Sequence, residues 1–138
     1  MRGGWTSSYR KVTLKIDDPN SPVTAPFGGI KNLVYVDEFY HFPPAGPYSR
    51  EKLHILFSID TEKTAMSPWP IRPDNDYGLS WIKNRGKRRV FYCEPGHTPT
   101  LFMTPMLAEH ILAGIQFVLG DLEADATPSA RVTAKRRN

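Results

Sequence analysis

A nearly continuous apolar run from Leu53 to Ile59 restricts the possible folds of this chain more than any other stretch. A strand with one face in solvent alternates apolar and polar residues, whereas this run is apolar on both faces. We therefore place it in the middle of a sheet. Both faces of that sheet then need cover from other parts of the chain or from outside it.

Four other stretches have the alternation or the β-forming residues of strands: 9–16, 33–42, 77–83 and 88–93. The last two flank a tight turn at residues 84–87, so they are expected to form a hairpin. Prolines and glycines separate the other stretches. The sequence thus predicts about five strands.

Residues 105–119 are expected to form one long helix, with Thr104 as N-cap, a proline at the first position and Gly120 as the stop. Apolar residues cover most of its circumference, so we expect burial on more than one side. Glu109 and His110 then form its polar strip. One helix cannot cover both faces of the sheet, and we expect a second copy of the chain or a missing segment to cover the remaining face.

The 138 residues allow one α/β domain, placed at residues 1–122, and the small, polar and basic residues 123–138 are expected to be disordered. Arg131, Lys135, Arg136 and Arg137 account for the net charge of +4, so the chain before them is neutral and we expect no nucleic acid partner. No apolar run approaches the roughly 18 residues of a membrane span, and no signal peptide is apparent. We expect no membrane partner, and a cytoplasmic location if Met1 is the native start.

His97 is the first functional candidate, because it follows a strand and a Pro-Gly break, where reactive side chains often gather. A loop histidine that binds backbone is the alternative. Glu38 and Asp37 are the next candidates, since an acid among apolar strand residues loses solvation unless it is paired. The alternative is that the strand ends near Asp37 and both acids are solvated.

Other chemistry has weaker support. Cys93 lies near His97, but no nucleophile elbow surrounds it, so a small strand residue is the favoured interpretation. His41, His54, His97 and His110 have no metal-ligand spacing. We expect neither a metal nor a cofactor.

Four motifs occur in order along the chain: Asp37-Glu38-Phe39-Tyr40, the run from Gly86 to Tyr92, Gly96-His97 and the run from Gly114 to Asp121. In this order they resemble the carboxyl half of the ThuA-like, or trehalose utilisation, family, over about residues 3–130, with Trp81 and Gly3-Gly4 at matching places. The sequence departs from the family at Arg88, where the family usually has glycine. By this resemblance, we expect the amino-terminal βαβ half of the family's domain to be missing from the chain.

The resemblance implies a class I glutamine amidotransferase-like, flavodoxin-like fold and a role in disaccharide catabolism through 3-keto-glycosides. His97 is similar in position to the base of that superfamily's triad. Proton abstraction beside the ketone would use His97 as base and Glu38 or Asp37 as its partner or as a second acid. Contacts to the sugar are expected from Tyr40, Arg89, Tyr92 and Gly96. The alternatives are a non-catalytic carbohydrate-binding or assembly module and an inactive fragment.

Overall fold

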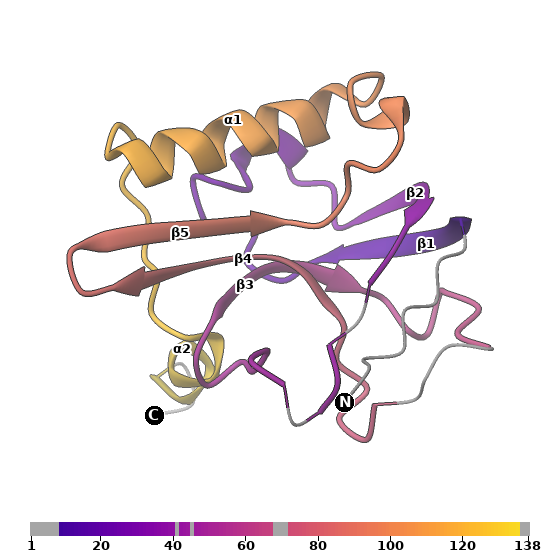
Figure 1. Cartoon of the computed structure of the whole chain (residues 1–138), viewed down its shortest axis with the longest axis horizontal. Helices are drawn as coiled ribbons and strands as arrows, with labels where there is room; N and C mark the ends of the chain where they lie inside the picture. Colours follow the sequence, from indigo (N-terminus) through magenta and orange to yellow (C-terminus); the bar gives the residue numbers. More distant parts are fainter. Residues whose placement is uncertain (1–8, 41, 45, 68–71, 136–138) are drawn as a thin grey trace.

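The computed structural model of the chain describes residues 9–40, 42–44, 46–67 and 72–135 (Figure 1). Gly3, Gly4 and His41 lie outside these residues. Within the described part of the chain, no helix is both long and apolar enough to cross a membrane.

The described residues form one mixed α/β structure around a five-stranded sheet in the order β2-β1-β3-β4-β5. Its strands are β1 Tyr9–Ile16, β2 Asn32–Glu38, β3 His54–Ile59, β4 Gly78–Arg85 and β5 Arg88–Cys93. All six residues of β3 are buried, which confirms the central strand predicted from the apolar run. The predicted hairpin is also present: β4 and β5 pair up to Arg85 and Arg88, and Gly86 takes φ 61°, a left-handed conformation that suits glycine.

Each pair of neighbouring strands is antiparallel. The described residues therefore do not form the parallel sheet around which a flavodoxin-like domain is built. The two edge strands, β2 and β5, approach each other at their carboxyl ends because the sheet curls. The backbone N–H of Gly96, just after β5, donates to Oδ2 of Asp37 in β2 at 2.9 Å. Figure 1 shows β2 beside the segment that leaves β5.

β2 is shorter than predicted. It ends at Glu38 rather than near residue 42, and it buries Tyr35 and Asp37. Val34 and Val36, which alternate with these two residues along the strand, are 56% and 47% exposed. Both faces carry apolar residues, so the alternation alone did not identify the inner one. Asp37 and Glu38 are nevertheless buried, and the solvated-loop alternative is wrong.

The helix α1, Pro105–Leu119, has the predicted bounds and ends at Gly120, which takes φ 92°. It packs on β5 through Gly114, where an added Cβ would lie 2.3 Å from Cε1 of Phe91. The prediction of burial on more than one side is wrong, because apolar residues of the outer face, such as Leu112 and Leu119, are exposed. The polar-strip interpretation of His110 is also wrong, since its side chain is completely buried.

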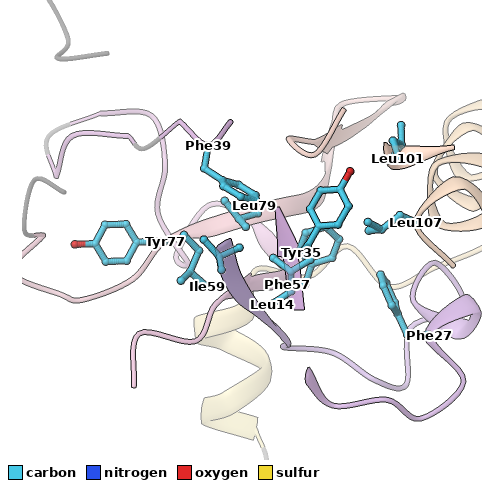
Figure 2. Close-up of a cluster of buried hydrophobic side chains, with 11 residues drawn as sticks. Leu14, Phe27, Tyr35, Phe39, Phe57, Ile59, Tyr77, Leu79, Leu101 and Leu107 are labelled. Atoms are coloured by element: carbon cyan, nitrogen blue, oxygen red, sulfur yellow. The ribbon is translucent and has the colours of Figure 1, made fainter. Parts of the chain in front are cut away.

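One core cluster lies between α1 and the sheet (Figure 2). The 3₁₀ helices η1, Ala25–Phe27, and η2, Pro99–Leu101, contribute Phe27 and Leu101 to it. Figure 2 shows Leu101 and Leu107 approaching Tyr35 from the α1 side. This cluster ties α1 to β1, β2 and β3.

The face of β3, β4 and β5 away from α1 is covered by the chain itself. Residues from the segment before β3 join strand residues in an aromatic cluster: Phe42, Tyr48, Leu53, Ile55, Trp81 and Tyr92. A second helix, α2 (Ser129–Lys135), lies on the opposite side of the strands from α1 in Figure 1. Its first backbone N–H donates to the carbonyl of Leu53 at 3.0 Å.

Two expectations change as a result. Residues 129–135 are helical and docked on the segment entering β3, so the disordered tail expected over 123–138 is wrong for this part. Outside cover is not needed for the face that Phe42, Tyr48 and α2 occupy. A homo-oligomer stays a prediction.

Candidate functional site

The curl of the sheet brings the carboxyl ends of β2 and β5 together and gathers a group of ionisable side chains there. β2 ends in Asp37 and Glu38, and β5 is followed by Glu94, Pro95, Gly96 and His97. Gly96 takes φ 152°, which suits glycine and turns the chain so that His97 lies over β2. The site therefore joins residues almost 60 positions apart.

Glu38 and His97 form the central pair. Nδ1 of His97 lies 2.7 Å from Oε2 of Glu38, and the hydroxyl of Tyr40 donates to the same oxygen at 3.3 Å. The Glu38 side chain is only 11% exposed, whereas that of His97 is 50% exposed. With its Nδ1 proton directed at Glu38, the imidazole has Nε2 as its basic atom. A buried carboxylate thus orients a half-exposed imidazole, an arrangement that suits general base chemistry.

Asp37 holds this corner together from inside. Its carboxylate is completely buried and accepts the backbone N–H groups of Glu38 at 2.8 Å and Gly96 at 2.9 Å. It therefore fixes the two strand ends that carry Glu38 and His97. The N–H of Gly96, expected to contact a sugar, is instead bonded to Asp37.

Glu94 is a member of the site that the sequence analysis missed. Its Oε1 accepts the backbone N–H of Tyr40, and its Oε2 lies 3.5 Å from the hydroxyl of Tyr92. Burial, reinforced by the nearby Asp37, raises the pKa of Glu94 to about 8, although the bonds from Tyr40 and Tyr92 act in the opposite direction. Glu94 thus carries a proton at neutral pH. Its position directly after a run of strand formers was the available signal.

Of the side chains expected to contact the sugar, those of Tyr40 and Tyr92 lie at the site. Tyr40 contacts Glu38, and Tyr92 contacts Glu94. Burial and then Glu94 raise the pKa of Tyr92, so its hydroxyl stays protonated. Tyr40 and Tyr92 can therefore donate hydrogen bonds here.

Arg89 does not belong to this site. It lies at the other end of β5, four residues and about 13 Å along the strand from Cys93. Its guanidinium donates to the carbonyls of Phe117 and Leu122 at 3.2 Å and to Glu123 at 2.5 Å. It therefore secures the end of α1, and its expected role in sugar binding is not supported by its position.

The remaining candidates from the sequence are placed in other environments. Burial, and then Glu94, raise the pKa of Cys93 to about 12, so it remains a thiol rather than a nucleophilic thiolate. His54 binds Asp18 at 2.9 Å, and His110 lies in the core. Over the described residues, no three His, Cys, Asp or Glu side chains are grouped as metal ligands are.

A comparison with protein-family models found a match to the model described as ThuA, trehalose utilisation, over residues 1–118. No curated protein and no solved structure matches the chain. The match confirms the resemblance that the four ordered motifs predicted.

Proposed function

Because the chain belongs to the ThuA, or trehalose utilisation, family, we propose that it acts on a 3-keto-glycoside of disaccharide catabolism by acid/base chemistry. The observation that carries this proposal is the pair formed by Glu38 and His97, a half-exposed imidazole held 2.7 Å from a buried carboxylate. General acid/base catalysis requires such an oriented base within reach of solvent or substrate. The further assignment to a class I glutamine amidotransferase-like domain is part of the same proposal.

The proposed step is removal of the proton on the carbon beside the ketone. Nε2 of His97 takes this proton, and Glu38 stabilises the imidazolium that forms. The electron pair of the C–H bond moves toward the ketone oxygen, where negative charge develops. A protonated donor must meet that oxygen.

Glu94 and Tyr40 are the proposed donors to the developing enolate. Glu94 carries a proton because burial raises its pKa to about 8. It shares the corner with His97 through the backbone of Tyr40, to which its Oε1 is bonded. An acid kept neutral beside an oriented base is the division of roles that enolisation needs. Tyr92 orients Glu94.

Turnover of a 3-keto-disaccharide by the 138-residue chain tests the proposal. His97→Ala is expected to lower kcat by 10²-fold or more, the usual contribution of a general base. Glu38→Gln should also lower it, because the amide no longer stabilises an imidazolium. Glu109→Gln is the matched control, since Glu109 is an exposed glutamate on α1. Full turnover by His97→Ala would exclude the proposed base.

The pH dependence distinguishes the acid from the base. Activity should fall as the pH rises through about 8, because Glu94 then loses the proton it donates. Glu94→Gln keeps a donor but cannot ionise, so the fall near pH 8 should disappear. A fall that persists unchanged in this variant would assign it to another group.

A further inference from the structure

We call the site formed by Asp37, Glu38, Tyr40, Glu94 and His97 the catalytic corner. A pocket of about 500 Å³ lies away from it, between the carboxyl end of β1, Pro44, residues 48–51 and residues 72–76. It shares no lining residue with the corner. In the pairing of β1 with β2, Arg10 lies opposite Asp37, and Asp17 follows seven residues later, just beyond the end of β1. At about 3.3 Å per strand residue, this end of the pocket is about 20 Å from the corner.

Two arginines build the wall of this pocket, and both are already paired. Arg50 donates Nε and Nη2 to the carboxylate of Asp76 at 2.9 and 2.8 Å, and its Nη1 lies 3.0 Å from Asp17. Arg72 donates in the same two-bond manner to Asp74 at 2.9 and 2.6 Å. Paired guanidinium and carboxylate groups make a rigid wall whose charges largely cancel.

The Asp17 carboxylate also belongs to this wall. Its side chain is only 10% exposed, and its Oδ2 is buried with no hydrogen bond donor among the described residues. Buried carboxylate oxygens in folded proteins are normally satisfied. Its neighbour Lys15 lies 3.9 Å from the other oxygen and is half exposed at the rim. The rim of the pocket thus offers an ammonium donor beside a carboxylate.

The charge balance decides the class of ligand. A phosphate or carboxylate would meet guanidinium groups that are already neutralised, and would lie beside four acids, Asp17, Glu51, Asp74 and Asp76. A cation would be opposed by Arg50, Arg72 and Lys15. A hydroxyl group both donates and accepts, so several hydroxyls on one neutral molecule match a wall of alternating donors and acceptors.

We propose that this pocket binds an uncharged polyhydroxylated molecule, a sugar of up to disaccharide size, at a site separate from the catalytic corner. The volume lies in the range of small-molecule sites. The inference rests on the pocket's own residues and does not depend on the chemistry proposed at His97. The protein would then hold sugar at two places, one for reaction and one for binding alone.

The test is an NMR titration of the 138-residue chain with trehalose, following the side-chain Nε–H signals of Arg50 and Arg72 and the backbone amide signals of residues 37–40 and 94–97. We expect saturable shifts of both signals, and the same shifts with His97→Ala. Inorganic phosphate at equal concentration is expected to leave both signals unchanged. Lys15→Ala, at the exposed rim, should weaken binding several-fold, and Ser49→Trp, which places a large ring in the pocket, should weaken it at least tenfold.

Three results would overturn the inference. The Arg50 and Arg72 signals could stay unchanged at 50 mM trehalose, a concentration chosen to be well above about millimolar dissociation constants. They could respond to phosphate instead. The shifts could also be confined to residues 37–40 and 94–97, which would leave the catalytic corner as the one place where sugar binds. Because the titration of the unaltered chain decides each of these, the result does not depend on whether Ser49→Trp folds.

Discussion

Stability against unfolding should fall steeply in acid because of His110. The imidazole lies in the core against Phe27, Phe57 and Phe91, with Nδ1 2.8 Å from the carbonyl of Val23 and Nε2 2.9 Å from Oγ of Ser80. Burial lowers its pKa from 6.5 to about 4, despite the opposing bond to Val23. The native state therefore holds this imidazole neutral.

The size of the effect follows from proton linkage. Below pH 6.5 the unfolded chain binds a proton at His110 that the native state does not accept until about pH 4. The stabilisation is complete above the unfolded pKa and is lost as the pH falls. The loss amounts to about 2 kcal/mol at pH 5 and about 3 kcal/mol at pH 4.

Urea unfolding from pH 8 to pH 4, with the wild type and His110→Gln compared at each pH, measures this loss. Glutamine keeps polar atoms in the same place but does not titrate, and every other ionisable group is common to both proteins. At pH 8 the wild type should be the more stable, because it keeps the aromatic contacts of His110. The difference should shrink by about 3 kcal/mol by pH 4. A difference that changes by less than about 0.5 kcal/mol over this range would refute a neutral, buried His110.

Two further predictions concern α1. Gly114→Ala should lower the free energy of unfolding, measured with urea, by about 1–2 kcal/mol, because the clash with Phe91 outweighs the roughly 1 kcal/mol that alanine adds to a helix. Adding Phe91→Leu to the same chain should recover part of this loss. Losses that simply add in the double variant would contradict the clash. Arg89→Ala should cost about 1–2 kcal/mol through its lost bonds to two backbone carbonyls. Glu123→Gln should lower the free energy of unfolding by less than about 0.5 kcal/mol, because that carboxylate is 77% exposed. Equal losses for Arg89→Ala and Glu123→Gln would show that the ion pair, rather than the bonds to the carbonyls, stabilises the end of α1.

The elements with strong local signals were predictable from the sequence. β1, β5 and α1 have the predicted bounds, because alternation, the turn at Gly86 and the terminal Gly120 each act within a few residues. The inner face of β2 was not predictable, since apolar residues occupy both of its faces and pairing with β1 decides between them. Features set by contacts between distant segments are therefore the ones that the sequence analysis missed.

In the site, too, the residue types were predictable from local signals, whereas the contacts between distant segments were not. Glu38 and His97 were both candidates, and the structure brings them to 2.7 Å, but the curl that joins two sheet edges leaves no local signal in the sequence. Arg89 was grouped with them because it lies in another of the four family motifs, although it occupies the opposite end of β5. His110 looked like a surface residue because its partner Ser80 lies 30 residues away.

The closure of the sheet at Asp37 and Gly96 also sets the order in which the chain can fold. The hairpin of β4 and β5 closes a turn of two residues, whereas the Asp37–Gly96 contact closes a loop of almost 60 and joins strands that are not neighbours in the sheet. Long loops lose more chain entropy on closure and form late. All five strands can therefore pair before Glu38 meets His97. A refolding chain would recover its sheet first and the contact between Glu38 and His97 last.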